Sequence, residues 1–139
     1  PGCALTADMI TGFPGETEAD QAAAVAFLEQ VGFAAVHVFP YSRRPGTKAD
    51  AMPEQLSHAV KSARAHEAQR VADACKQRYL VQQVGQTLPV LFETEHDGSW
   101  VGHSDNYCLV RAAGDDLRGL VKNVKISAVS GQMLVGDLV

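Results

Sequence analysis

The chain has 139 residues, of which 46% are hydrophobic and 20% are charged, a composition typical of a globular protein with one domain or two small ones. No apolar run approaches the roughly 18 residues of a membrane span, and a net charge of −4 is unlike that of a strongly basic nucleic-acid-binding domain. Three widely separated cysteines, Cys3, Cys75 and Cys108, favour neither a disulfide framework nor a complete zinc or iron–sulfur site.

The first 40 residues predict a strand–helix–strand unit. Residues 4–11 are rich in apolar and β-branched side chains, which indicates a strand. Thr17 and Asp20 have the spacing of a capping box, so we expect a helix over residues 18–31. The apolar segment 33–39 indicates a second, buried strand. This order is typical of a βαβ unit with parallel strands.

We expect the chain to be a fragment of a longer protein. It begins with Pro1 rather than Met, directly before a predicted core strand. Two parallel strands and one helix cannot bury both faces of a sheet, so further strands are needed on each side. Those strands would come from parts of the protein upstream of this sequence.

Two connections follow the predicted strands. The glycine-rich turn at residues 12–15 lies between a strand and a helix start, a common ligand position in α/β proteins. On the turn alone, a tight connection without a ligand is the more common case. The loop at residues 41–53 follows the carboxyl end of the second strand. Its Arg43 and Arg44 could pair with phosphate or carboxylate, or form a solvated basic loop.

Residues 54–83 lack Gly and Pro and predict a long helix that links two domains. A narrow apolar stripe is expected along it, and the remainder is basic and polar. Such a face is usually solvated, and a nucleic-acid surface is the less common reading. The expected members of the stripe are Val60, Ala63, Val71, Ala74 and Tyr79.

Residues 85–139 predict a small antiparallel barrel of the nucleic-acid-binding kind. Turn signals separate five short strand candidates, and apolar and polar residues alternate in 124–128, the mark of one buried face. Tyr107 falls in one of these strands, where an aromatic side chain is more often core than ligand contact. The candidates are residues 88–92, 99–103, 107–111, 120–129 and 133–139.

The motifs in residues 8–20 (Asp-Met-Ile-Thr-Gly-Phe-Pro-Gly-Glu-Thr-Glu-Ala-Asp) and 37–47 (His-Val-Phe-Pro-Tyr-Ser-Arg-Arg-Pro-Gly-Thr) resemble the radical S-adenosylmethionine methylthiotransferases. The five-strand segment resembles their TRAM domain. The resemblance implies an α/β region followed by an all-β region. Residues 1–53 would be the end of a partial (βα) radical S-adenosylmethionine barrel, 54–84 a linking helix, and 85–139 the TRAM domain.

The resemblance implies S-adenosylmethionine and [4Fe–4S] clusters as cofactors of the parent protein. The cluster-binding Cys-x-x-x-Cys-x-x-Cys motif is not in this sequence, so the chain alone is expected to be inactive. The general radical-enzyme pattern places an acid one residue before Glu16, so it assigns Glu16 no clear role. The cofactor contacts that the resemblance suggests are Ile10, Gly12, Phe13, Pro14, Gly15, Tyr41 and Ser42.

The resemblance further implies a cytoplasmic enzyme that acts on tRNA and has no membrane partner. Residues 37–41 are most similar to enzymes that methylthiolate threonylcarbamoyladenosine beside the anticodon, and the isopentenyladenosine enzymes are the near alternative. A stand-alone RNA-binding module and a protein–protein adaptor are the rival classes. The sequence leaves the sulfur donor and the oligomeric state open. Suggested RNA contacts are Arg43, Arg44, Tyr107, Arg111, Lys122 and Lys125.

Overall fold

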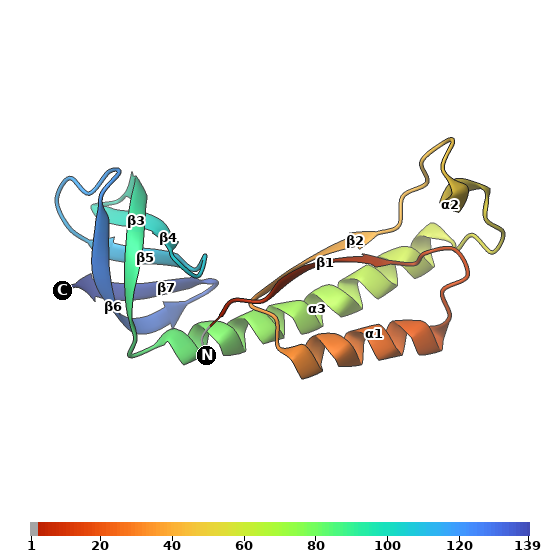
Figure 1. Ribbon diagram of the computed structural model, residues 1–139, viewed down its shortest axis with the longest axis horizontal. Coiled ribbons are helices and arrows are strands. Elements are labelled where there is room, and N and C mark those ends of the chain that lie inside the picture. Colours follow the sequence, from red (N-terminus) through yellow and green to blue (C-terminus); the bar gives the residue numbers. More distant parts are fainter. Residues whose placement is uncertain (1–2) are drawn as a thin grey trace. The chain divides into compact units, whose positions relative to one another are not determined.

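The computed structural model describes residues 3–139, which form two compact units. We call Leu5–Lys76 the α/β unit, and residues 3–4 with Gln77–Val139 the barrel unit. Figure 1 shows both as ribbons; the helix α3 (His58–Gln83) contributes residues to each. Residues 1–2 of the predicted first domain lie outside the described part of the chain.

The α/β unit contains the predicted strand–helix–strand order. Its strands β1 and β2 pair in parallel, from Thr6 opposite Ala35 to Thr11 opposite Pro40, which confirms the predicted βαβ unit. Its elements are β1 (Thr6–Thr11), α1 (Glu18–Val31), β2 (Ala35–Pro40), the short α2 (Lys48–Ala51) and the first part of α3.

Helix α1 begins and ends where the sequence predicts. The Thr17 hydroxyl accepts a hydrogen bond from the Asp20 amide at 3.2 Å, and the Asp20 carboxylate accepts one from the Thr17 amide at 2.9 Å. The hydroxyl also donates to that carboxylate at 2.7 Å. This side-chain hydrogen bond, together with the backbone one, holds the pKa of the Asp20 carboxyl below its ordinary value. Local signals suffice because all the partners lie within three residues.

Helices α1 and α3 cover one face of the two-stranded sheet. Leu28 of α1, Val36 of β2, and Ala68 and Val71 of α3 are buried together in the core of this unit. On the other face Ile10 is 57% exposed and Phe39, its partner in register, is 50% exposed. The prediction of a fully buried second strand is therefore wrong, because no described residue covers this face.

The buried stripe of α3 differs from the predicted one. Val60 is 37% exposed, and Ala63 and Ala74 are also exposed. The helix begins at His58 and not at the predicted Glu54. Glu54 is not helical, because it adopts a left-handed conformation with φ 61°. Its carbonyl accepts a hydrogen bond from the Gly15 amide. Of the predicted stripe, only Val71 and Tyr79 are buried. The residues that the helix buries are Arg64, Ala68, Val71, Ala72, Cys75, Tyr79, Leu80 and Gln83.

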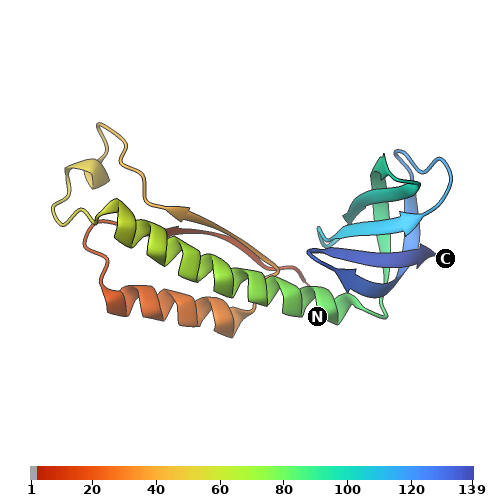
Figure 2. The same ribbon diagram turned by 180° about the vertical axis from the view of Figure 1, so that it is seen from behind.

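The barrel unit is a closed five-stranded barrel with the strand order β3-β4-β5-β7-β6. The prediction of an entirely antiparallel barrel is wrong, because β5 and β7 pair in parallel. A ring with an odd number of strands cannot alternate direction all the way round, so at least one pair must be parallel. Figure 2 shows these two strands side by side. The strands are β3 (Thr87–His96), β4 (Ser99–Ser104), β5 (Leu109–Ala113), β6 (Val121–Ser130) and β7 (Met133–Leu138).

The barrel interior is filled by apolar side chains such as Phe92, Val110 and Leu134, which are fully buried. The register between β3 and β4 shifts beside Phe92, which marks a bulge that helps the sheet to curl. At Gly102 a Cβ atom would lie 2.7 Å from the Cα of Phe92, so only glycine lets the two strands approach.

Among the described residues, no helix is both long and apolar enough to cross a membrane.

Candidate cofactor and RNA surfaces

The glycine-rich turn after β1 is held by a buried ion pair. The Gly12 amide donates to both carboxylate oxygens of Glu16, each at 2.9 Å. Glu16 also pairs with the Arg64 guanidinium of α3 at 2.6 Å, with side-chain exposures of 15% and 10% respectively. Arg64 donates a further hydrogen bond to the Glu16 carbonyl at 2.9 Å. This network fixes the turn on the helix.

Sequence reasoning missed this role of Glu16 and Arg64. The two residues are 48 positions apart, and Arg64 looks like one more cation on a polar helix. The role of Glu16 could have been predicted from its position four residues after Gly12, where a carboxylate can accept a hydrogen bond from the turn amide. Gln21 of α1 adds a second polar tie, because its amide donates to the Arg64 carbonyl at 3.2 Å and to Glu67 at 3.0 Å.

Gly12 is required by helix packing. It has φ 71°, and a Cβ atom there would lie 2.5 Å from Cγ of Lys61 and 3.2 Å from its Cα. The sequence suggested that this glycine lets a ligand approach the backbone. The structure shows that the glycine allows close approach of α3.

The connections after β1 and β2 meet at one end of the sheet. The Tyr41 amide donates to the Thr11 carbonyl at 2.8 Å, and the rings of Phe13 and Tyr41 pack edge to face with centroids 5.2 Å apart. The Lys61 ammonium lies 5.2 Å from the centre of the Tyr41 ring and donates to the Tyr41 carbonyl at 3.3 Å. Because these are the carboxyl ends of parallel strands, the arrangement has the position of a ligand site in α/β proteins.

The suggested cofactor residues fall into three places. Ile10 lies on the exposed face of the sheet. Phe13 and Tyr41 form the aromatic pair beside Gly12. Pro14 is buried within the turn, while the Gly15 amide bonds to the Glu54 carbonyl at 3.2 Å and Ser42 is exposed.

Arg43 and Arg44 behave differently from each other. Arg43 forms an ion pair with Asp50 at 2.6 Å and donates to the Asp50 carbonyl at 2.9 Å. The first contact is the exposed kind that contributes little to stability. The Arg44 side chain is exposed, and its carbonyl accepts from the Thr47 hydroxyl at 2.8 Å. Arg44 is therefore the better placed of the two to meet an anion.

The residues present do not fit an iron–sulfur cluster. Cys3 is exposed, whereas Cys75 and Cys108 are buried at separate places in the fold. Within residues 3–139, no group of three or more Cys, His, Asp or Glu side chains converges as metal ligands. A cluster needs such a set of thiolates.

The barrel unit presents Tyr107 on its surface, where its ring is 86% exposed. The expectation of a core position is wrong, because Tyr107 lies in the tight turn between β4 and β5 and adopts φ 60°. Strand β5 begins only at Leu109, where the sequence suggested residue 107. The alternation that would have buried the ring therefore does not reach it.

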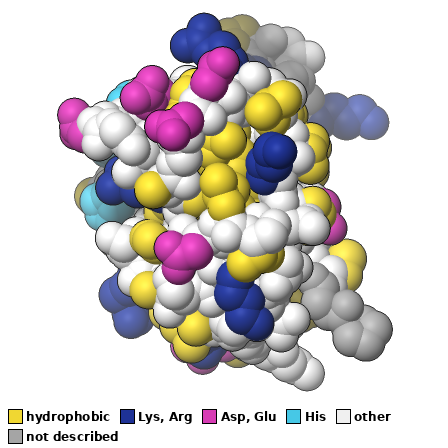
Figure 3. All heavy atoms as spheres, turned by 90° about the vertical axis from the view of Figure 1, so that its left-hand side faces the viewer, with side chains coloured by type: hydrophobic (Ala, Val, Ile, Leu, Met, Phe, Trp, Pro, Cys, Tyr) yellow, Lys and Arg dark blue, Asp and Glu magenta, His cyan; other side chains and the backbone are white. Residues whose placement is uncertain are grey.

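Among the suggested RNA contacts of the barrel, Arg111 and Lys122 have exposed side chains, and Arg111 lies on the outer side of β5 between the buried Val110 and Ala112. The Lys125 ammonium donates to the Gly85 carbonyl at 2.5 Å. Figure 3, which faces the barrel, shows hydrophobic side chains gathered in one area, with both basic and acidic side chains beside them. Nucleic-acid binding by this face would therefore depend on individual cations rather than on a continuous basic surface.

Comparison with known proteins gives relatives along almost the whole chain. The chain is 38% identical over 132 residues to a threonylcarbamoyladenosine tRNA methylthiotransferase of Bacillus subtilis, covering 91% of this chain and 29% of that protein. It is 40% identical over 141 residues to a tRNA-2-methylthio-N(6)-dimethylallyladenosine synthase of Maricaulis maris, covering 99% and 31%. The chain is 36% identical over 141 residues to the protein of the same name from Campylobacter jejuni, covering 100% of this chain and 33% of that protein.

The chain thus spans about a third of the length of the curated relatives it matches. No family model matches it. The identities are high enough, and extend far enough along the chain, to confirm the resemblance that the sequence motifs carry. This chain is a homologue of part of the methylthiotransferases.

Proposed function

We propose that the chain is the carboxyl-terminal part of a radical S-adenosylmethionine enzyme that methylthiolates a modified adenosine next to the tRNA anticodon. The observation that carries this proposal is the identity of 36–40% along nearly the whole chain to proteins named for that reaction. The parent protein is then a cytoplasmic tRNA-modifying transferase.

Threonylcarbamoyladenosine is the preferred substrate in this proposal, and isopentenyladenosine is the next. The support is the His-Val-Phe-Pro-Tyr sequence at residues 37–41, since identities of 38% and 40% to the two kinds of relative do not separate them. Activity of the parent protein on tRNA carrying one or the other nucleoside, measured by mass spectrometry of the digested tRNA, decides between the two substrates.

The exposed face of β1 and β2 fits one side of an S-adenosylmethionine site. Ile10 and Phe39 lie opposite each other in register and offer an apolar surface to an adenine ring. The turn held by Glu16 and the aromatic pair at Tyr41 lie at the carboxyl end of the same strands. When bound with its iron–sulfur cluster, S-adenosylmethionine supplies the radical that starts the methylthiolation.

In this proposal the chain holds part of the cofactor site and does not catalyse the reaction alone. The cluster ligands belong to the parent's N-terminal domains. Anaerobic reconstitution of the parent protein should give iron–sulfur absorbance and cleavage of S-adenosylmethionine, and residues 1–139 alone should give neither. A colourless, inert parent protein would contradict the assignment.

The barrel is proposed to bind tRNA, with Arg111 and Lys122 as its candidate phosphate contacts. Seven acidic and four basic residues in 85–139 give the barrel segment a net charge of −3, so affinity depends on local placement of the cations. The alternative is a stand-alone RNA-binding module without catalysis, which the closed barrel supports because a closed barrel leaves no strand edge unpaired. It predicts RNA binding by the chain and no activity in any longer form.

A further inference from the structure

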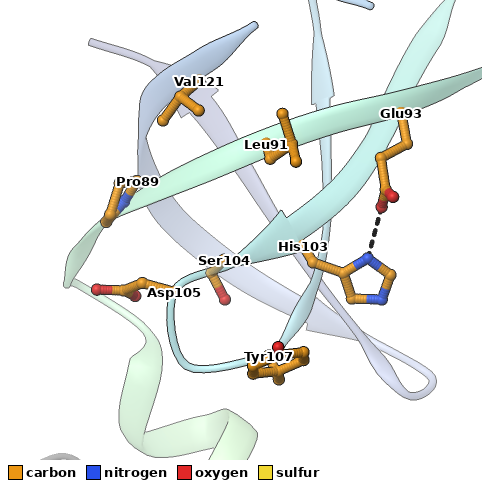
Figure 4. Close-up of a pocket in the computed structure, with 8 residues that line it drawn as sticks. All are labelled: Pro89, Leu91, Glu93, His103, Ser104, Asp105, Tyr107 and Val121. Carbon is orange, nitrogen blue, oxygen red and sulfur yellow. Dashed lines mark hydrogen bonds and ion pairs between the residues drawn. The ribbon is translucent and has the colours of Figure 1, made fainter. Parts of the chain in front are cut away.

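The outer face of the barrel has a pocket of about 500 Å³, within the range of small-molecule sites. We call it the Tyr107 pocket. Figure 4 shows the residues that line it, which come from β3, β4, the β4–β5 turn and the start of β6. All of them lie within the barrel unit, so the pocket does not depend on the α/β unit.

The floor of the Tyr107 pocket is apolar although it faces outward. Leu91 of β3 is 43% exposed and pairs in register with Val121 of β6, which is 62% exposed. On its other side Leu91 pairs with His103 of β4. Apolar side chains in register on neighbouring strands leave a continuous surface for a flat, uncharged group.

The Tyr107 ring is held at the edge of this floor by a firmly bonded turn. The Tyr107 amide donates to the Ser104 carbonyl at 3.0 Å. The Ser104 hydroxyl donates to Asn106 Oδ1 at 2.6 Å and accepts from the Cys108 amide at 3.1 Å. The Asn106 amide donates to the hydroxyl of Tyr79, a buried residue of α3, at 3.1 Å. A left-handed conformation is uncommon for a bulky residue, and such strain gathers at ligand contacts.

The rim of the pocket is polar and carries carboxylates. Glu93 Oε2 lies 2.6 Å from His103 Nδ1, and Asp105 is exposed nearby. Two carboxylates repel a phosphate from the pocket itself, but they accept hydrogen bonds from N–H groups. Arg111 lies on the outer side of β5, which pairs with β4 beside the pocket, where it can meet a phosphate of a strand that passes by. Lys122 of β6 is in register with the buried Val90 and is therefore on the other face from Leu91 and Val121.

We propose that the Tyr107 pocket takes one unstacked RNA base that carries an exocyclic amino group. The base stacks on the Tyr107 ring, lies over Leu91 and Val121, and donates its amino N–H to Glu93. The inference rests on the proposed RNA binding and adds to it the place and the chemical class of the base. Stacking on aromatic rings and reading of base edges are the usual means of single-strand recognition.

Cytosine and uracil are matched probes of the same size: cytosine has an amino group at C4 and an acceptor at N3, whereas uracil has a carbonyl at C4 and an N–H donor at N3. Oligocytidine and oligouridine of about six nucleotides, within the site size of one small barrel, should be titrated against the full chain by fluorescence anisotropy. We expect the cytidine strand to bind about fivefold more tightly, as one additional hydrogen bond allows. The variant Glu93→Leu, which has no hydrogen-bond acceptor, should remove that difference.

Tyr107→Ala should weaken both strands about 5- to 100-fold, the range of one lost base stack, while Tyr107→Phe keeps the affinity. The ring is exposed, so the urea midpoint of Tyr107→Ala should equal that of the original chain. Arg111→Ala is the matched control: it should weaken both strands equally and lower the salt slope by about one.

The outcomes separate this inference from the proposed function. If the chain binds no RNA at all, the pocket assignment and the proposed RNA binding by the barrel are overturned, while the assignment to the enzyme is decided separately by reconstitution of the parent protein. If the chain binds RNA and Tyr107→Ala does not change the affinity, the pocket assignment alone is overturned. The apolar pocket would then be a candidate site for a protein partner. If Tyr107→Ala weakens binding but cytidine and uridine strands bind equally, the recognition of the amino group is overturned.

Discussion

The two units treat their strand edges in opposite ways. In the barrel each strand has two neighbours, so no edge is left unpaired. In the α/β unit β1 and β2 have only each other among the described residues, and one face of their sheet exposes Ile10 and Phe39. The barrel can therefore be stable by itself, while the α/β unit depends on the buried ion pair and the helix core. Further strands would complete its sheet.

The largest expected effect is in the barrel. Phe92→Ala removes a fully buried ring and should lower the free energy of unfolding by about 4 kcal/mol. Trp100, the single tryptophan, is buried in β4, so its fluorescence in urea reports on the barrel. Val121→Ala, at a position 62% exposed, should change the midpoint little. An equal loss of unfolding free energy for both variants would contradict the burial of Phe92 in the barrel interior.

Next comes the ion pair of the α/β unit. Arg64→Met leaves the Glu16 carboxylate largely buried without its partner and should destabilise this unit by about 3 kcal/mol. Hydrogen exchange at the Gly12 amide should accelerate, because its acceptor is no longer held. Arg44→Met, at an exposed site, is the control. If Arg64→Met moved the Trp100 transition as far as Phe92→Ala does, the two units would not unfold independently.

A smaller effect is expected at the turn. Gly12→Ala meets both a positive φ and the side chain of Lys61, whereas Gly46→Ala meets a φ of 85° with no atom within 4 Å. The second variant should cost about 1 kcal/mol from backbone strain alone, and the first should cost more. Thermal unfolding followed by far-ultraviolet circular dichroism compares them. An equal loss of stability for the two variants would mean that Gly12 is not in close contact with Lys61 of α3.

The smallest effect concerns the cap of α1. The hydrogen bonds from Thr17 lower the pKa of Asp20 in the folded chain, so Asp20 contributes stability above its unfolded pKa, and this contribution is lost as the pH falls through the folded value. The change therefore lies below about pH 4. In an NMR titration, Thr17→Val should raise the pKa of Asp20 toward its ordinary value. An unchanged pKa would show that the threonine hydroxyl is not its cause.

Local signals predicted the features whose partners are close in sequence. Helix α1 and its cap follow from Thr17 and Asp20. One of the turns expected between the strand candidates is the hairpin between β3 and β4, where Asp97 and Gly98 have φ 51° and 73°. Short turns and caps can be read in this way because their hydrogen bonds close within a few residues.

Features that depend on distant partners could not be read from the sequence. The bond between Glu16 and Arg64 requires a particular rotation of α3, and the face that this helix buries is set by its packing with Leu28 and Val36. Tyr107 lies outside the barrel because β5 begins two residues later than predicted. The parallel pair of strands could have been foreseen, since it follows from closing five strands into a ring.

That parallel pair also has the fewest residues in register of any two neighbouring strands of the barrel. Strand β7 pairs with β6 at six positions but with β5 at only two, Val110 with Leu134 and Arg111 with Val135. When the barrel breathes, β6 and β7 should therefore swing away together as a hairpin, with the opening at β5. Arg111 is one of the two β5 residues that pair with β7. A phosphate bound both by Arg111 and by the β6–β7 hairpin would therefore stabilise the closed barrel.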